Sequence, residues 1–411
     1  MYKKIIAALL SAGTAMYAEN LSSLLASIES NDGLQAQKAL EQAADGRYSS
    51  VIRGYAPKFE LLGGYSKKSQ TTDFEPKETK LGEAKAGVAI FDGLKREGSI
   101  MAASKSAESE KYKTGYMRQS IMLDTVREYF GAITATAMSE SLGFKISELN
   151  QNIKRLSILT QNGLATKDTL EAMIASKKEA EYELENVTLS LQNSLLKLEL
   201  YTGKSGILPI KTVLFEPDDK KAERADIKAD KLVVEGLKWQ EWQNTYLPSL
   251  MLESSHKKYS YGPYNDMGGA QKLPEWQNTI SLQLSFTIFD FGKIAKEREA
   301  ARLQTLAASK NLAYKQNGLA IESKLKKIEL EAAKKKLDAA KAALAATETS
   351  YGYTKKRFDA NLVSYTDYLS ELTKKEAALS RVASASSEVE IKKAELAFAN
   401  GTDIKTLTKG E

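Results

Sequence analysis

The sequence contains one pattern twice, at a constant spacing. A Phe-Asp-Gly segment beginning at Phe91 recurs as Phe-Asp-Phe-Gly at Phe289, and Gly-Leu-Ala-Thr at Gly163 recurs as Asn-Leu-Val-Ser at Asn361. Both pairs are 198 residues apart, since 289 − 91 = 198 and 361 − 163 = 198. Two separate motifs at one spacing indicate two copies of one unit. At roughly 200 residues this unit is far longer than the repeats of about 20 to 50 residues that build solenoids and propellers.

A third motif shows that the copies differ in length at one place. Pro57 follows Tyr55-Ala56, and Pro248 follows Tyr246-Leu247, at a spacing of 248 − 57 = 191. The second copy therefore contains seven additional residues between Pro248 and Phe289. We expect the following division of the chain: a first repeat at 19–202, a connector or equatorial segment at 203–221, a second repeat at 222–400 and a C-terminal tail at 401–411.

Apolar residues recur at helical spacing over long stretches of both copies. Leu330, Ala333, Leu337, Ala340 and Leu344 step by three and four residues, the pattern of a coiled-coil seam. The stretch of about 65 residues that contains them would span about 100 Å as a helix. We predict helices at about 34–54, 94–160 and 164–200 in the first copy, and at about 222–245, 292–358 and 362–399 in the second.

A different residue pattern lies between the short and long helices. From Trp276 to Ile288, apolar residues alternate with hydroxyl and amide residues, and only Asn278 interrupts the apolar side. Strict alternation indicates a strand with one apolar and one polar face. The first copy alternates more weakly before Phe91. The predicted strands are about 57–66, 81–91, 248–257 and 276–289, one hairpin per copy.

The first eighteen residues have the features of a secretory signal. Lys3 and Lys4 precede an apolar run from Ile5 to Ala12, and small residues lead to a predicted cleavage after Ala18. No other run approaches the roughly 18 apolar residues of a spanning helix. The chain has no cysteine, which excludes disulfides and thiolate metal sites. Its formal charge of +6 is spread over helices, so no nucleic-acid partner is expected.

Catalysis has little support in the sequence. His256 is the single histidine, placed by the pattern in a loop after a strand, and no second histidine or cysteine could complete a metal or nucleophile site. We therefore expect no enzyme activity, no metal and no cofactor.

Strands of nine to eleven residues with one apolar face and one polar face are typical of transmembrane β-barrels. Four strands cannot close in lipid, so this interpretation requires several copies of the chain. Two copies would supply eight strands, and side chains would fill the interior of such a barrel. Three copies would supply twelve strands and leave a lumen. The alternative is that the hairpins cap a soluble coiled coil. The aromatic residues near the strand ends would be interfacial girdles in the first case: Tyr55, Tyr65, Tyr246, Tyr259, Tyr261 and Trp276.

The order and spacing of these motifs resemble the TolC-like outer-membrane efflux proteins. The resemblance rests on the tandem repeat, the Pro-led hairpins, the Phe-Asp-Gly exits into long helices and the motif at 361–369. It implies an α+β membrane protein that forms a homotrimer, with a 12-stranded β-barrel in outer-membrane lipid continuous with a periplasmic α-helical barrel. It also implies two partners, a periplasmic adaptor (membrane fusion protein) and an inner-membrane pump of RND, ABC or MFS type.

The resemblance also implies a periplasmic gate at the helix tips. Asp367 matches an acidic position of the family's second tip, Glu371 lies near it, and Asp168 is the acid of the first tip, one residue out of register. Asp367 could equally be a solvated or helix-capping acid. The residues expected to contact the adaptor are those of the two tip motifs: Gly163, Leu164, Ala165, Thr166, Asn361, Leu362, Val363 and Ser364.

Two classes of function remain open from the sequence. The first is an outer-membrane exit duct for drugs, small molecules or proteins, served by an adaptor and a pump. The second is a soluble periplasmic coiled-coil scaffold or adaptor. The alternation at 276–289 and the need for four matched strands favour the duct.

Overall fold

The computed structural model describes residues 17–210, 212–218, 222–270, 272–360 and 362–408. The chain forms two compact units, each of which draws residues from both repeats. Unit 1 comprises the described parts of Met1–Lys38, Lys113–Ile227 and Lys315–Glu411, and unit 2 comprises Ala39–Tyr112 and Lys228–Tyr314. Residues 1–16 of the predicted signal lie outside the described ranges.

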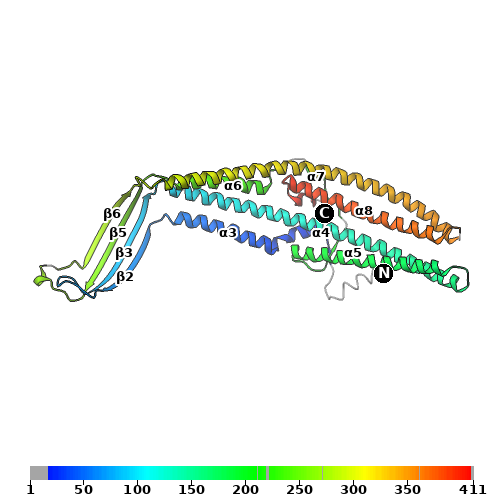
Figure 1. Cartoon of the computed structure of the whole chain (residues 1–411), viewed down its shortest axis with the longest axis horizontal. Helices are drawn as coiled ribbons and strands as arrows, with labels where there is room; N and C mark the ends of the chain where they lie inside the picture. The colour runs from blue at the N-terminus through cyan, green and yellow to red at the C-terminus, as the bar shows by residue number, and fades with distance from the viewer. Residues whose placement is uncertain (1–16, 211, 219–221, 271, 361, 409–411) are drawn as a thin grey trace. The chain divides into compact units, whose positions relative to one another are not determined.

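The two repeats contain the same long helices at the same spacing. Helix α4 (Lys95–Gln161) and helix α7 (Lys293–Asp359) have 67 residues each. They begin and end 198 positions apart, since 293 − 95 = 198 and 359 − 161 = 198. Each continues through a short turn into a second helix, α5 (Lys167–Thr202) or α8 (Tyr365–Ala399) (Figure 1). The α4–α5 and α7–α8 pairs are called the first and second helical hairpins below.

Unit 1 is built around the ends of α5 and α8. Short helices α2 (Leu21–Ser27), η2 (Ile28–Ser30) and η5 (Ile404–Thr408) pack there, and β1 (Tyr17–Glu19) pairs in parallel with β4 (Ile207–Pro209). The hydroxyl of Tyr129 donates to the carbonyl oxygen of Ile210 at 2.6 Å. The fully buried core residues come from helices far apart in the sequence and include Leu21, Leu24, Ile28, Val126, Tyr129, Leu198, Ala397 and Ile404.

The connector and the C-terminal tail meet in this unit. The amide of Phe215 donates to the carbonyl of Leu407 at 3.0 Å, and the amide of Leu214 donates to the buried carboxylate of Glu390 at 2.7 Å. Lys393 donates to the carbonyl of Leu214 at 2.9 Å and pairs with Glu390 at 3.2 Å. The connector is therefore held on α8 by a buried ion pair that also satisfies its backbone groups.

A second charged network lies on the same helix. The carboxylate of Glu395 is surrounded by Arg127, Lys326 and Lys392, each at 2.9 Å. Burial acts to raise the pKa of Glu395, but the hydrogen bonds from Lys326, Arg127 and Lys392 outweigh it and lower the pKa to about 2. Glu395 therefore joins α4, α7 and α8 by charge-assisted hydrogen bonds.

Unit 2 contains a four-stranded antiparallel sheet. Its strands are β2 (Lys58–Lys67), β3 (Glu78–Phe91), β5 (Ser249–Tyr261) and β6 (Trp276–Ser285), in the order β2-β3-β5-β6 (Figure 1). Strands β2 and β6 form the edges. Helix α3 (Asp32–Arg53) precedes β2, and helix α6 (Ala225–Gln240) with η3 (Glu241–Gln243) precedes β5.

The seven additional residues of the second copy are divided between a strand and a loop. β5 has 13 residues where β2 has 10, and the connection at 262–275 has 14 residues where that at 68–77 has 10. The differences of three and four account for all seven. The loop also contains a short 3-10 turn, η4 (Met267–Gly269). His256, expected in a loop after the strand, lies within β5, inside the range of about 248–257 predicted for that strand.

The last strand is shorter than the alternation suggests. The pattern continues to Ile288, but β6 ends at Ser285, which pairs with Ser249 at the beginning of β5. The residue before Ser249 is Pro248, which has no amide hydrogen to continue the ladder. The chain then turns at Phe291 and Gly292, which have φ of 55° and 79°, before α7 begins.

Candidate functional site

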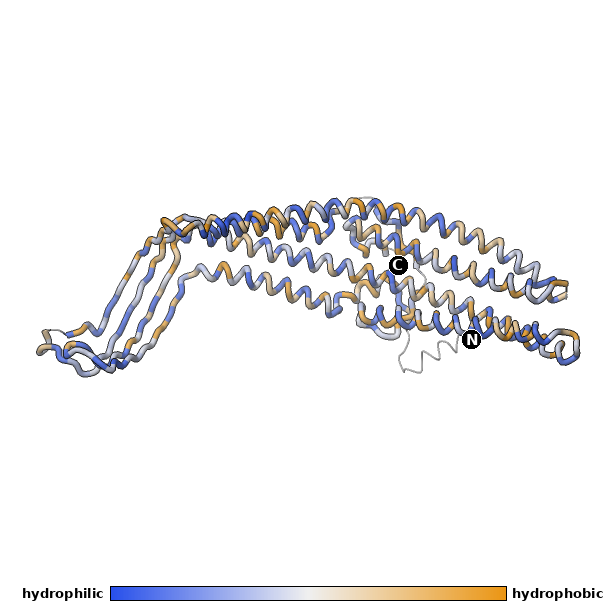
Figure 2. The backbone as a smooth tube through the Cα atoms, viewed as in Figure 1, coloured by the Kyte–Doolittle hydropathy of each residue, from blue (hydrophilic) through white to orange (hydrophobic). Residues whose placement is uncertain are grey.

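The strand register divides the sheet into an apolar and a polar face. Leu252 lies opposite Leu282 on one neighbour and Val88 on the other, and Phe59 lies opposite Ala86. Figure 2 shows hydrophobic and hydrophilic residues alternating along the strands. The large side chains of the apolar face are exposed, with 82% exposure for Phe59 and 79% for Ile280. A soluble protein rarely leaves several large apolar side chains uncovered on one face of a sheet.

The opposite face carries charges that pair across strands. Glu83 of β3 lies opposite Lys257 of β5, with nitrogen and oxygen 3.6 Å apart. Lys85 of β3 pairs with Glu253 of β5 at 2.8 Å and lies opposite Glu60 of β2. The opposite charges in these cross-strand pairs balance one another, so the middle of the polar face is nearly neutral.

The aromatic residues expected as a girdle lie in three places. Tyr65 and Trp276 are on the apolar face at the loop end of the sheet, where Trp276 contacts the ammonium of Lys258 at 4.8 Å from the ring centroid. Tyr259 and Tyr261 fall on the polar face, since Tyr259 is opposite Leu81 and Tyr261 opposite Thr79. Tyr55 and Tyr246 precede β2 and β5 at the other end, and the Tyr246 hydroxyl is 3.0 Å from Asp290.

The helix tips have similar turns in both repeats. Gly163 has a φ of 73°, and the amide of Leu164 donates to the carbonyl of Leu159 at 2.8 Å. The amide of Leu362 donates to the carbonyl of Arg357 at the same distance, and Asn361 lies outside the described residues. Both turns are therefore closed by an amide–carbonyl bond spanning five residues, as in a Schellman-type helix end. Leu164, Thr166, Leu362 and Ser364 are exposed, whereas Ala165 and Val363 are partly buried.

The acids expected at the gate have local partners in the protomer. Ser364 caps α8 by accepting the amide of Asp367 at 3.1 Å, and its hydroxyl donates to the Asp367 carboxylate at 2.7 Å. In the first hairpin the Thr166 hydroxyl holds the pKa of Asp168 below its usual range. Both exposed acids lie in the first turn of a helix, where the helix dipole favours negative charge.

Glu371 links the two helices of the second hairpin. Its carboxylate accepts hydrogen bonds from Ser350 of α7 and from Lys374, both at 2.7 Å. The hydrogen bonds from Lys374 and Ser350 lower the pKa of Glu371, so it is ionised at neutral pH.

Polar contacts near the tips join the first hairpin to the second. Lys355 of α7 donates to Glu148 of α4, and Asn152 donates to the hydroxyl of Tyr368 at 3.0 Å. Arg155 lies 3.6 Å from the carboxylate of Asp359. We call these three contacts the inter-hairpin links. Sequence reasoning did not find them, because their partners are more than 200 positions apart and on different helices.

The inter-hairpin links surround a buried aromatic cluster. The Phe358 and Tyr368 rings stack at 4.4 Å, and Tyr351 and Tyr365 lie beside them. Burial raises the pKa of Tyr351 to about 12, with a further contribution from Glu148. Burial likewise raises the pKa of Tyr368 and Tyr365, so all three hydroxyls remain protonated at physiological pH. The cluster packs the two hairpins together at this level.

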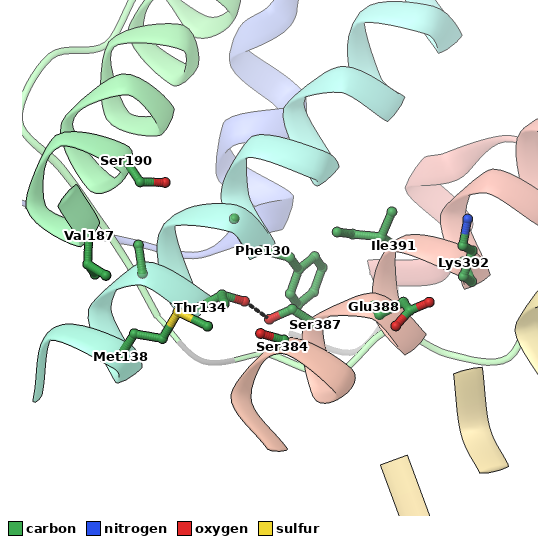
Figure 3. Close-up of a pocket in the computed structure, with 12 residues that line it drawn as sticks. Phe130, Thr134, Met138, Val187, Ser190, Ser384, Ser387, Glu388, Ile391 and Lys392 are labelled. Carbon is green, nitrogen blue, oxygen red and sulfur yellow. Dashed lines mark hydrogen bonds between the residues drawn. The ribbon is translucent and has the colours of Figure 1, made fainter. Parts of the chain in front are cut away.

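Farther from the tips the hairpins are separated by a groove of small side chains. A cavity of about 460 Å³ lies between α4, α5 and α8, lined by Gly131, Ala135, Ser190 and Ser384, with Met138 at one end (Figure 3). The Thr134 hydroxyl donates to that of Ser387 at 2.6 Å across it (Figure 3). The groove is open space between the first hairpin and α8 at this level.

Two helices in unit 1 expose apolar side chains at coiled-coil spacing. On α5, Tyr182, Leu189 and Leu196 are seven residues apart and about two-thirds exposed. On α7, Ile321 and Ile328 are also seven apart and 67% exposed. Such heptad stripes pack against another helix in stable proteins. We call them the α5 stripe and the α7 stripe.

Among residues 17–210, 212–218, 222–270, 272–360 and 362–408, no group of three metal-ligating side chains converges. His256 packs against the ring of Trp276 at 5.3 Å. In the same ranges no helix is both long and apolar enough to cross a membrane.

Comparison with known proteins shows what this chain resembles. Residues 243–402 match the family described as outer membrane efflux protein. The resemblance to outer-membrane efflux proteins is confirmed. The match covers the part of the second repeat that holds β5, β6 and the second helical hairpin, and leaves α6 and the first repeat outside. No curated protein matches the chain in a sequence search.

Two solved structures of outer-membrane proteins extend the likeness of fold to nearly the whole chain. The outer membrane channel CmeC of Campylobacter jejuni is 17% identical, with 96% of this chain and 87% of that chain covered, at a TM-score of 0.84. The outer membrane protein VceC of Vibrio cholerae is 15% identical, with 93% and 96% covered, at a TM-score of 0.80. At these identities the comparison shows that the fold is shared, including the first repeat.

Proposed function

We propose that three copies of this chain form the exit duct of a tripartite efflux or type I secretion system in the outer membrane. The observation that carries the proposal is the four-stranded sheet, whose apolar face is exposed and whose opposite face is charged. Each edge strand would leave backbone groups unpaired in lipid, at several kcal/mol per group. Three sheets joined at β2 and β6 would supply twelve strands, enough to enclose a lumen.

The exposed stripes of unit 1 support the same association. The α5 stripe and the α7 stripe would each bury large side chains against a neighbouring copy, with about 1.5 to 3 kcal/mol gained per side chain. Because the stripes differ, their contact would be heterologous, and a heterologous contact closes into a ring when the rotation allows it. The long helices of three copies would form a periplasmic α-helical barrel.

The tips of the helical hairpins would form the periplasmic gate. Three copies would bring Asp367, Glu371 and Asp168 into rings of like charge, and the inter-hairpin links would hold the tips together in the closed state. A periplasmic adaptor would contact the exposed tip residues and shift the hairpins across the groove of small side chains. An inner-membrane pump of RND, ABC or MFS type would supply drugs, small molecules or proteins as cargo.

The two faces of the sheet fit a position in lipid. The apolar face would contact acyl chains, and Tyr65 with Trp276 would lie at the outer interface. Tyr55 and Tyr246 would lie at the periplasmic interface. Tyr259 and Tyr261 belong to the polar face, which would line the lumen. Residues 1–18 would direct export and be removed.

Conductance measured in planar lipid bilayers tests the duct directly. Purified full chain should insert and give discrete current steps, which grow when the inter-hairpin links are broken. The alternative, a soluble periplasmic scaffold, predicts no steps and release of the chain with the periplasmic fraction. Recovery in the outer membrane as a trimer that resists sodium dodecyl sulfate would exclude the scaffold.

A further inference from the structure

The insertion that distinguishes the second repeat carries a group of aromatic side chains. β5 begins 191 positions after β2 and ends 194 positions after it, since 249 − 58 = 191 and 261 − 67 = 194. The three added strand residues are Tyr259, Ser260 and Tyr261. Tyr264 follows in the longer loop. We call Tyr259, Tyr261 and Tyr264 the tyrosine cluster. Tyr259 and Tyr261 lie in the strand extension that β2 of the first repeat lacks.

The tyrosine cluster begins on the polar face of the sheet. Tyr259 follows Lys257 by two positions along β5, and Lys257 forms the ion pair with Glu83 on that face. Tyr65 and Trp276, at the same end of the sheet, are on the opposite face. The two groups of aromatic residues therefore meet different surroundings. Contact with lipid would explain the position of Tyr65 and Trp276 but not that of the tyrosine cluster.

The rings of the cluster are packed against one another. The rings of Tyr259 and Tyr261 are stacked, with centroids 5.8 Å apart and planes at 7°. The ring of Tyr264 meets Tyr261 edge to face, with centroids 6.1 Å apart and planes at 74°. Both geometries are favourable for aromatic pairs. All three side chains are only partly buried, so the group remains accessible.

Hydrogen bonds to the loop fix two of these rings. The hydroxyl of Tyr261 donates to the carbonyl of Pro274 at 3.1 Å, and that of Tyr264 accepts the amide of Leu273 at 2.9 Å. The loop is tied in turn to the loop of the first repeat, because the amide of Asn265 donates to the carbonyl of Asp73 at 2.9 Å. Rings held in this way lose little side-chain entropy when a ligand binds.

We propose that the tyrosine cluster is a stacking site for planar aromatic molecules at the outer mouth of the channel. The proposal rests on the proposed function, which makes the polar face the lumen wall. A planar ligand would lie against the Tyr259–Tyr261 pair and extend its stack, and a planar cation would also be attracted by the ring quadrupoles. The site would retain such molecules briefly as they leave, and would favour them over non-aromatic cations of equal charge.

Two cations of equal charge separate stacking from simple electrostatics. 1-Methylquinolinium is planar and aromatic, and tetraethylammonium is neither. Current block by each is measured with the purified full chain in planar bilayers, with the cation added on the loop side. In a Tyr259→Leu, Tyr261→Leu variant, the half-blocking concentration of 1-methylquinolinium should rise about tenfold, which corresponds to about 1.4 kcal/mol. Block by tetraethylammonium should not change.

The control variant is Tyr65→Leu, which removes an aromatic ring from the opposite face at the same end of the sheet. It should leave block by both cations unchanged. An unchanged half-blocking concentration of 1-methylquinolinium in the double variant would overturn the proposal, and so would an equal loss of block by both cations. Calorimetric titration of the same cations into detergent-solubilised protein should show the same selective loss. Calorimetry tests the stacking site even if the protein gives no current in bilayers. The lack of current would count against the proposed duct and not against the stacking site.

Discussion

Glu148 on α4 accepts a hydrogen bond from the ammonium group of Lys355 on α7, so an ion pair joins the two helical hairpins near their tips. Burial acts to raise the pKa of Glu148, but the hydrogen bond from Lys355 and the neighbouring hydroxyls of Tyr351 and Tyr368 outweigh it and lower the pKa. Burial acts to lower the pKa of Lys355, and the contacts with Glu148 raise it. Both groups are therefore charged at neutral pH, which favours this link between the hairpins.

Lys355→Met should loosen the closed tip. Lys355 is 45% exposed, so solvent screening limits the contribution of the pair to about 1 kcal/mol, or about fivefold in the population of the open tip. We expect larger single-channel conductance in bilayers and greater vancomycin sensitivity of cells. The matched control is Lys356→Met at the neighbouring exposed position, which should behave as the unmodified chain. Equal conductance for both variants would contradict a role for this link.

Asp367→Ala should also raise conductance if a ring of three acids contributes to the gate. Because Asp367 also contacts the capping hydroxyl of Ser364, its loss could act through fraying of α8. Ser364→Ala removes the cap, at a cost of about 1 kcal/mol, and keeps the carboxylate. A conductance increase in Asp367→Ala alone supports the charged ring. The same increase in both variants would assign the effect to the helix cap.

Leu189→Asp with Leu196→Asp should prevent association of the copies. Both side chains are about two-thirds exposed in one protomer, so the protomer should keep its helical content. The charged residues would be buried at the contact between copies, which should shift the complex to monomers in analytical ultracentrifugation. Glu183→Gln, at an exposed acid on a different face of α5, is the control and should leave the complex unchanged. Intact trimers in the double variant would exclude the α5 stripe from the interface.

Glu395→Gln should reduce stability at neutral pH and make it less sensitive to acid. The pKa of Glu395 is about 2 in the folded chain, against an ordinary value of 4.5. Its contribution, about 3 kcal/mol, is therefore complete above pH 4.5 and is lost as the pH falls toward 2. Thermal unfolding followed by circular dichroism at several pH values measures this. Glu331→Gln, an exposed acid, should show the pH dependence of the unmodified chain.

Periodicity was sufficient to predict the long helices. Leu330, Ala333 and Leu337 follow a spacing that only a helix brings onto one face, and the predicted 292–358 corresponds to α7 at Lys293–Asp359. The strand from Trp276 was also evident, but its end was not. Alternation continues through Phe286 to Ile288, and only the pairing with β5, which begins after Pro248, shows that the ladder ends at Ser285.

Features that depend on pairing between distant segments could not be predicted from one sequence. Tyr259 and Tyr261 were expected in an outer girdle, but the register with Leu81 and Thr79 places them on the polar face. The first strand of each hairpin alternates too weakly to reveal this. The same holds for Asn152 and Tyr368, which meet only because two helical hairpins lie side by side.

The most direct test of the account is the native mass of the complex extracted from purified outer membranes. The full chain has a mass of 45.2 kDa. Native mass spectrometry in detergent should give a single species of three chains, each shortened by the signal residues. Absence of the chain from the outer membrane, or its recovery there only as a monomer, would contradict the proposal that three copies form a transmembrane duct.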